Sequence, residues 1–245
     1  MGNKRNQNEI SGQQRKKLGV IGGIGPAATA YFYELLTKMA DVGSDQEHPE
    51  TLIISRPSIP DRSAYILGRS AESPIPPIIG AGRELVRMGV DIIAIPCVTS
   101  HSFFTELTAG VGAPIINMIE ETAGLLASSG VKCAGLMATD GTITSGLFSE
   151  ALQERGVRTV IPSAEMQAVV MDLIYNSVKA NKPVDISRFI AASDKLRANG
   201  AEAIVLACTE LSLIKRDFAL SGDYVDTLEV LARRALELCG VGVRS

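Results

Sequence analysis

The chain has 245 residues with a net charge of −3, and 46% of its residues are apolar and 21% charged, as in an ordinary globular protein. This balance gives no electrostatic reason to expect nucleic acid or an anionic membrane as a partner, and no apolar run is long enough to span a bilayer. Four cysteines in a chain of this length do not form a disulfide framework, so we expect reduced thiols and a cytoplasmic location.

The predicted elements alternate between strands and helices along the first half. A polar tail, which we expect to be disordered, covers residues 1–16. Strands are then predicted at 17–23, 51–55, 90–96 and 113–117, and helices at 26–40, 78–88 and 102–110. Continuous apolar strands separated by amphipathic helices favour α/β architecture, with mostly parallel sheets flanked by helices.

The second half follows the same order. Strands are predicted at 132–138, 158–162 and 201–207, and helices at 144–156, 163–180 and 184–200. When "RELVRMGVDIIAIPCVTS" is set above "DKLRANGAEAIVLACTEL", Gly89 falls opposite Gly200 and Cys97 opposite Cys208. A repeat of half the chain predicts two pseudo-symmetric lobes. Ligands of such sheets bind beyond the carboxyl ends of the strands, so we expect the active site in the cleft between the lobes.

The two cysteines at equivalent strand ends suggest a specific chemistry. A cysteine at the end of a buried strand is usually a packing residue, as we expect for Cys133 and Cys239. Cys97 and Cys208 differ because each lobe supplies one, and a helix start after each favours the thiolate. Two thiols on opposite faces of a substrate carbon can remove a proton from one face and return one to the other. This pattern is typical of a racemase that needs no cofactor.

Other ligand classes have weaker support. The chain has only two histidines and no C-x-x-C or H-E-x-x-H, so we expect no metal site, and His101 is interpreted as a pocket residue near a helix start. The spacing of Gly23, Gly25 and Ala28 resembles a dinucleotide fingerprint, in which Arg56 could contact a phosphate. We favour a tight turn at Gly23 that lets backbone N–H groups approach a substrate carboxylate.

The motifs together resemble the aspartate/glutamate racemase superfamily, and the aspartate racemase branch in particular. The resemblance runs from about Lys17 onward, through "LGVIGGIGPAATA", "PSIPDRSAYILG", "PCVTSH", "PIINMIEETA", "GLMATDGTITSGLF" and "ACTEL". It implies a cofactor-independent isomerase acting on amino acids, a homodimer, and a helix near 225–238 that returns to the first lobe. The lobes implied are residues 17–116 plus 223–245, and residues 117–222.

The resemblance also implies roles for individual residues. Cys97 and Cys208 correspond to the catalytic acid/bases, and Arg62 and Lys179 to cations near the substrate carboxylates, although a solvated arginine and a helix-end lysine are common elsewhere. Hydroxyls that correspond to the anion pocket are carried by Thr99, Thr139, Thr142 and Thr209.

Two positions depart from the branch and leave the substrate open. Val98 stands where an asparagine is usual, and Arg56 is additional; we count Val98 among the residues that contact the substrate. Three alternatives remain at this point: a maleate-isomerase-like isomerase, a decarboxylase, and a non-catalytic small-molecule sensor.

Overall fold

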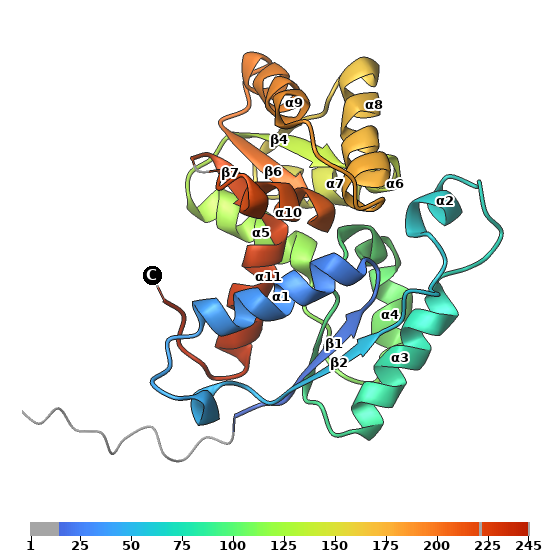
Figure 1. Ribbon diagram of the computed structural model, residues 1–245, viewed down its shortest axis with the longest axis vertical. Coiled ribbons are helices and arrows are strands. Elements are labelled where there is room, and N and C mark those ends of the chain that lie inside the picture. The colour runs from blue at the N-terminus through green and yellow to red at the C-terminus, as the bar shows by residue number, and fades with distance from the viewer. Residues whose placement is uncertain (1–14, 221, 245) are drawn as a thin grey trace, which may run out of the picture.

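The computed structural model describes residues 15–220 and 222–244, so most of the tail predicted at residues 1–16 lies outside the described part. Figure 1 shows two lobes stacked along the long axis, with the first half of the chain forming the lower one. Each lobe has a parallel sheet with helices on both faces, which confirms the predicted fold class.

The lower lobe is built on a three-stranded sheet of order β2-β1-β3. Its strands are β1 (Leu18–Gly22), β2 (Thr51–Ser55) and β3 (Ile92–Ala94). Its helices are α1 (Pro26–Met39), η1 (Asp45–Glu47), α2 (Arg62–Ile66), α3 (Ile75–Arg87), η2 (Val98–Phe103) and α4 (Phe104–Val111). The short helix α2 lies between the strand predicted at 51–55 and the helix predicted at 78–88, where the sequence predicted no element. The Asp61 side chain caps it by accepting from the Ala64 N–H.

The upper lobe is built on a four-stranded sheet of order β5-β4-β6-β7. Its strands are β4 (Cys133–Ala138), β5 (Arg158–Val160), β6 (Ala203–Ala207) and β7 (Tyr224–Asp226). Its helices are α6 (Asp140–Ser145), α7 (Leu147–Gln153), α8 (Ala164–Asp172), η3 (Leu173–Val178), α9 (Ile186–Ala198) and α10 (Thr209–Asp217). The π-helical turn η3 continues α8, so the helix predicted at 163–180 changes its winding before it ends.

Alternating side chains divide the interior into three apolar clusters. In β3 and β6, every second residue faces a central cluster that includes side chains of both lobes. The alternate residues of each strand face the other side of the sheet, where each lobe has an outer cluster of its own. Cys97 belongs to the outer cluster of the lower lobe and Cys208 to that of the upper lobe. The two cysteines therefore occupy equivalent positions in the two lobes, as the repeat predicts.

Two helices close the central cluster between the sheets. Asn117 caps α5 (Met118–Ser128) and Asp226 caps α11 (Thr227–Leu238), each through its side-chain oxygen. The strand predicted at 113–117 is reduced to one bridge between Ile93 and Ile115, because Asn117 already begins α5. Helix α11 packs against α1 and α5, and Figure 1 shows it between the lobes.

The last segment of the chain serves both lobes. Strand β7 pairs with β6, so it extends the upper sheet, although we assign residues 223–245 to the first lobe from the sequence. Strand β7 was not predicted, because a short strand at a sheet edge shows no periodic pattern in the sequence. The domain boundaries as such stay a prediction.

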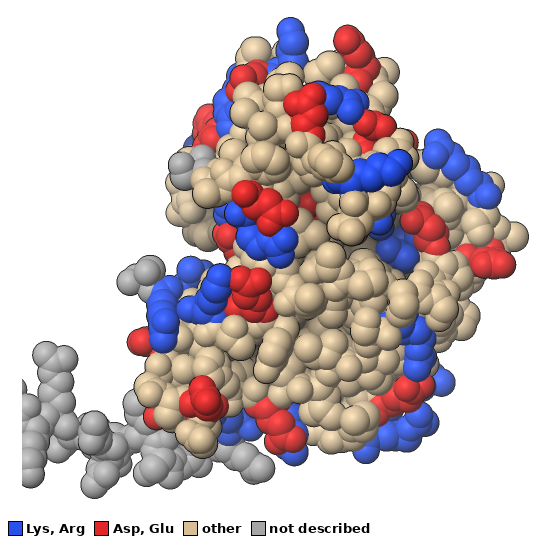
Figure 2. Space-filling model, viewed as in Figure 1, with Lys and Arg blue, Asp and Glu red and all other residues tan. Residues whose placement is uncertain are grey.

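The surface is mixed in charge. Figure 2 shows acidic and basic side chains interspersed on the face drawn, in keeping with the small net charge. Among the helices of the described residues, none is both long and apolar enough to cross a membrane.

Candidate active site

The two predicted catalytic cysteines line one small enclosed space between the lobes. Cys97 precedes η2 and Cys208 precedes α10, and both have extended backbone angles at the N-cap position. Their exposed fractions are 6% and 5%. We call the enclosed volume of about 10 Å³ the inner space; it is lined by Ile24, Asp61, Arg62, Ser63, Cys97, Val98, Thr99, Thr139, Tyr175, Lys179, Cys208, Thr209 and Glu210.

Four hydroxyl groups from both lobes gather beside the inner space, and three of them, those of Ser63, Thr99 and Thr139, line it. Thr139 Oγ1 lies 3.0 Å from Ser63 Oγ, 3.2 Å from Thr99 Oγ1 and 3.1 Å from Thr142 Oγ1. The hydroxyls of Thr99 and Thr142 are 3.0 Å apart. Each hydroxyl both donates and accepts, so this cluster can turn several O–H groups toward one anion. Thr209, the fourth predicted hydroxyl residue, is also buried and lines the same space.

Arg62 brings a buried positive charge to Cys97. Its guanidinium donates to the backbone carbonyls of Pro60 and Ile24 at 3.0 and 3.3 Å, and only 7% of the residue is exposed. Burial by itself lowers the pKa of Arg62, but the charges of Cys97 and Asp61 outweigh burial and raise it. Arg62 is therefore a buried cation whose position is fixed by the carbonyl groups around it. It is not the solvated surface arginine that the sequence left as an alternative.

Cys208 faces a charge of the opposite sign. Its thiol donates to Glu210 Oε2 at 2.9 Å, and Glu210 Oε1 pairs with Lys179 Nζ at 3.3 Å. Burial raises the pKa of the Cys208 thiol well above its usual value, and Glu210 adds to this effect while Lys179 opposes it. Although burial lowers the pKa of Lys179, Glu210 and Cys208 raise it overall, so the lysine stays charged.

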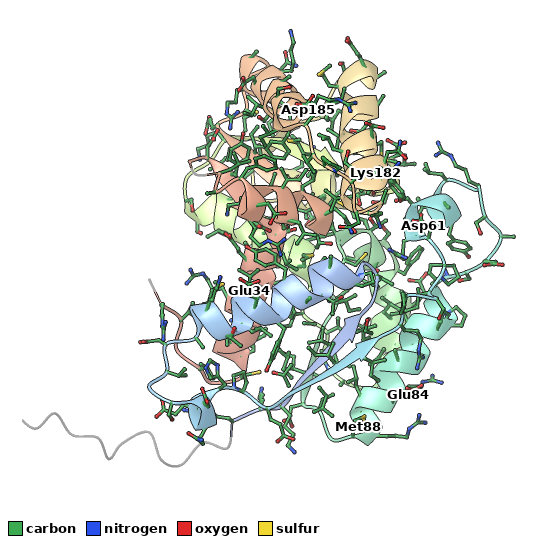
Figure 3. The ribbon with its side chains drawn as sticks, in the orientation of Figure 1. Glu34, Asp61, Glu84, Met88, Lys182 and Asp185 are labelled. Carbon is green, nitrogen blue, oxygen red and sulfur yellow. The ribbon has the colours of Figure 1, made fainter. Side chains whose placement is uncertain are left out.

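A side-chain contact joins the lobes beside Arg62. The Tyr175 hydroxyl, on the π-helical turn η3, donates to Asp61 Oδ2 at 3.0 Å. Figure 3 labels Asp61 next to α2, at the level where the lobes meet. Lys179 lies over the Tyr175 ring at 5.1 Å, because the η3 turn places both residues on the side that faces the lower lobe. Burial, together with Asp61, raises the pKa of Tyr175 to about 12, so the phenol remains a donor.

A larger cavity adjoins the inner space. It has a volume of about 510 Å³ and we call it the outer cavity. It shares five lining residues with the inner space: Ile24, Asp61, Arg62, Lys179 and Glu210. Its remaining lining is formed by Gly23, Gly25, Pro26, Ala27, Ala28, Pro57, Ile59, Val178, Asn181 and Leu213. A molecule that enters between the thiols can therefore extend into this second volume.

Glycines at equivalent turns allow the lobes to approach each other. A Cβ atom at Gly141 would lie 2.7 Å from Ser63 Cα, and one at Gly25 would lie 3.0 Å from Glu210 Oε1. Gly23 has a positive φ of 87°, and a Cβ atom there would lie 2.3 Å from the Arg56 backbone nitrogen. The protein's own backbone therefore requires Gly23, which also lines the outer cavity.

Other predicted positions lie away from the inner space. Arg56 forms an ion pair with Glu84 at 2.9 Å, and it lines neither volume. His101 was expected in the pocket, but its Nδ1 and Nε2 contact the backbone oxygens of Cys97 and Ile116 at 3.0 and 3.2 Å. It is buried under the site and supports the Cys97 turn. In the part of the chain that the structure describes, no group of three or more His, Cys, Asp or Glu side chains is arranged to hold a metal ion.

Sequence reasoning missed four polar residues that line the inner space, and the apolar Ile24. Glu210 lies in the quoted "ACTEL" motif and Asp61 in "IPDR", so a search for charges beside the predicted site residues would have found both. Ser63 and Tyr175 are ordinary polar residues on helices. No spacing in the sequence indicated that Ser63 contacts Thr139, or Tyr175 contacts Asp61, in the other lobe.

The fold and the site define a class of protein: a two-lobed α/β protein in which equivalent strand ends bring one thiol from each lobe to one enclosed site. The chain belongs to the Asp/Glu/Hydantoin racemase family, whose model matches residues 21–235. Membership of this family identifies the chain as an isomerase of the amino-acid racemase type, which confirms the predicted family and enzyme class.

Three relatives illustrate the similarity. The structure of Picrophilus torridus aspartate racemase is 32% identical with a TM-score of 0.83, over 93% of this chain and 96% of that chain. The structure of an aspartate racemase homologue from Pyrococcus horikoshii is 25% identical with a TM-score of 0.74, over 92% of this chain and 99% of that one. A broad specificity amino-acid racemase of Bacillus subtilis is 25% identical over 226 residues, or 88% of this chain and 95% of the relative.

Proposed function

We propose that the protein is a cofactor-independent amino-acid racemase in which Cys97 and Cys208 are the two acid/bases. The observation that carries this proposal is that both thiols, one at the equivalent strand end of each lobe, line the same buried space. The aspartate racemase and broad specificity racemase among the relatives support an amino acid as the substrate.

The proposed reaction transfers two protons. A thiolate on one side removes the proton from Cα, and the electron pair left on carbon is delocalised into the α-carboxylate. The thiol on the other side then gives its proton to the opposite face of Cα and becomes the thiolate. The configuration is inverted, no net proton is consumed, and the enzyme is ready for the reverse reaction.

The charges around the two sulfurs suggest which one begins as the base. Cys208 holds its proton toward Glu210, which is the arrangement of an acid. Cys97 lines the same space as the buried Arg62 guanidinium, a cation that can accompany a negatively charged group there. In the state that the structure describes, we therefore assign Cys97 as the base and Cys208 as the acid, and the opposite enantiomer requires the exchanged state.

The remaining polar groups suit an amino acid. The hydroxyl cluster of Ser63, Thr99, Thr139 and Thr142 can donate to the α-carboxylate, and the carboxylates of Asp61 and Glu210 can receive the ammonium group. The inner space of about 10 Å³ is near the roughly 10–15 Å³ that one water molecule needs, so the lobes must part for the substrate to enter.

Serine substitutions test the proposal. We expect Cys97→Ser and Cys208→Ser each to abolish racemisation, because a serine hydroxyl supplies almost no base near neutral pH. Cys133→Ser and Cys239→Ser are matched controls, since both cysteines are buried and neither lines the inner space. Circular dichroism or chiral chromatography of single enantiomers gives the readout. Racemisation near the wild-type rate in either site variant would rule out the two-thiol mechanism.

Several accompanying proposals depend on the family resemblance. We propose that no metal, pyridoxal phosphate or nicotinamide takes part, so that chelators leave the activity unchanged while alkylation of the thiols removes it. A homodimer and a cytoplasmic location stay predictions. Sedimentation at micromolar concentration tests the first, and a monomer there would contradict it.

A further inference from the structure

We infer that the preferred substrates are amino acids with neutral, apolar side chains, which occupy the outer cavity, and not aspartate or glutamate. This inference rests on the proposed racemase activity and adds the substrate class. It depends on the position of the outer cavity, on the nature of its walls, and on the charges already present at its base.

The position of the outer cavity fits a substrate side chain. Proton transfer requires Cα to lie between Cys97 and Cys208, in the inner space. The hydroxyl cluster that can hold the α-carboxylate lies on the side of the inner space: Ser63, Thr99 and Thr139 line it, and none of the four residues lines the outer cavity. The side chain therefore has one direction left that offers volume, through the shared residues into the outer cavity of about 510 Å³.

The walls of the outer cavity are mostly apolar. They come from the start of α1, from the segment after β2, and from two helices of the upper lobe. The apolar residues are Pro26, Ala27, Pro57, Ile59, Val178 and Leu213. An aliphatic or thioether side chain removes apolar surface from water here, which contributes about 25 cal/mol per Å² buried. A carboxylate against these apolar residues would lose hydration, and their side chains offer it no donor.

The cations at the base of the cavity already have partners. Arg62 donates to the carbonyls of Pro60 and Ile24, and Lys179 pairs with Glu210. The charged side chains that line the cavity in the described structure are two cations and two carboxylates, and their sum is zero (+2 − 2).

A zwitterion with a neutral side chain keeps this balance. A side-chain carboxylate would add one uncompensated negative charge next to Asp61 and Glu210. The Arg62 Nε atom is buried and has no partner among the described residues, so it can donate to one oxygen of the α-carboxylate.

Val98 agrees with this reading inside the inner space. It is only 2% exposed, it belongs to the central apolar cluster, and it lines the space beside Thr99. Its side chain offers neither a donor nor an acceptor to a polar substrate group.

The experiment compares substrates in deuterium oxide, with loss of the α-proton followed by NMR. We expect kcat/KM for leucine and methionine to exceed the values for aspartate and glutamate by about tenfold or more. A preference for aspartate or glutamate would overturn the inference and leave the proposed racemase activity standing. Exchange of no amino acid at all would overturn both, so the two failures are distinguishable.

Substitutions at one exposed residue of the cavity wall sharpen the comparison. We expect Ala27→Phe to lower the ratio of leucine to alanine turnover by about tenfold, because it fills part of the cavity. Ala27→Lys should instead raise glutamate relative to leucine by a similar factor, about tenfold, because it adds a cation.

The matched controls are Ala30→Phe and Ala30→Lys, since Ala30 is exposed on the same helix and does not line the cavity. We expect these variants to keep the wild-type ratios to within about twofold. If both Ala27 variants also keep the wild-type ratios, the side chain does not occupy the outer cavity and the inference fails.

Discussion

The Cys208 thiol donates a hydrogen bond to the Glu210 carboxylate, with 2.9 Å between sulfur and oxygen. Both residues are buried, and Glu210 also pairs with Lys179. The carboxylate thus favours the protonated form of the thiol, since its negative charge raises the pKa of Cys208.

Removing the charge of Glu210 should lower the pKa of Cys208 for two reasons. The Glu210 anion raises this pKa, and Lys179, whose charge lowers the same pKa, would no longer be paired with an anion. Racemisation needs one protonated thiol. We therefore expect the alkaline limb of the pH profile of Glu210→Gln to lie at lower pH than that of the wild type. The control is Glu229→Gln, which removes a matched pair with Lys215 outside the site. An unshifted alkaline limb in Glu210→Gln would show that this carboxylate does not act on Cys208.

The two cysteine variants should differ in the proton exchange that remains. A lone thiolate can still remove the α-proton of the enantiomer presented to it and return a solvent proton to the same face. We expect Cys97→Ser and Cys208→Ser to retain exchange with opposite enantiomer preference, measured by NMR in deuterium oxide. Equal free energies of the enantiomers force kcat/KM for racemisation to be the same in both directions, so exchange is the informative readout. The same preference in both variants would contradict a base on each face.

Arg62 should be important for turnover because its charge is buried. Loss of one member of a desolvated charge contact costs about 2–5 kcal/mol. We therefore expect Arg62→Ala to lower kcat/KM by roughly thirtyfold or more. Arg69→Ala is the control, since Arg69 is exposed on the same segment of the lower lobe. A loss below about tenfold (1.4 kcal/mol) would indicate that Arg62 acts only on the structure of its loop.

The glycine at the start of α6 should be required for closure of the lobes. A Cβ atom at Gly141 would meet the Ser63 backbone at 2.7 Å, so Gly141→Ala must push α2 away from α6. We expect destabilisation by about 1–3 kcal/mol, together with a fall in kcat. Gly124→Ala is the matched control, because Gly124 lies within α5 and has no atom within 4 Å of an added Cβ. Equal behaviour of the two variants in denaturant titrations and in turnover would contradict the close contact.

The cap of α11 should make stability depend on pH. Burial, with a contribution from Glu229, raises the pKa of Asp226 to about 6. The folded state therefore favours the protonated acid: this stabilisation is fully present below about pH 4 and is lost as the pH rises through about 6. Two pKa units correspond to about 2–3 kcal/mol. In Asp226→Asn, this part of the pH dependence should disappear from urea titrations.

Asp185 provides a control of opposite sign. It also caps a helix, α9, but it is exposed, and its hydrogen bonds to Ser187 lower its pKa. Its contribution to stability is present above the unfolded pKa and is lost as the pH falls. Asp185→Asn should therefore alter only the acidic side of the profile. If Asp226→Asn has the same pH dependence as the wild type, the acid is not protonated on folding.

Much of the fold could be predicted because the repeat places the same pattern twice. The strands that precede Cys97 and Cys208 are apolar throughout and end at a change in composition, so both their existence and their equivalence were visible. The strand at Tyr224–Asp226 was not predicted, because three residues at a sheet edge show no period.

The sequence predicted the site residues that lie in recognisable motifs, but it did not predict the contacts that these residues make between the lobes. Thr99, Thr139 and Thr142 were expected as separate hydroxyls, but their mutual contacts depend on how the lobes pack. Arg56 shows the reverse case: an additional charge suggested a role in substrate choice, and in the fold it pairs with Glu84 on α3, which Figure 3 labels in the lower lobe.

The closed inner space also bears on how the enzyme withstands oxidants. Peroxide attacks thiolates that it can reach, and both site sulfurs are almost fully shielded behind a volume of about 10 Å³. The opening that admits a substrate is then also the opening that admits peroxide. We therefore expect an amino acid in the site to slow the oxidation of both thiols by peroxide.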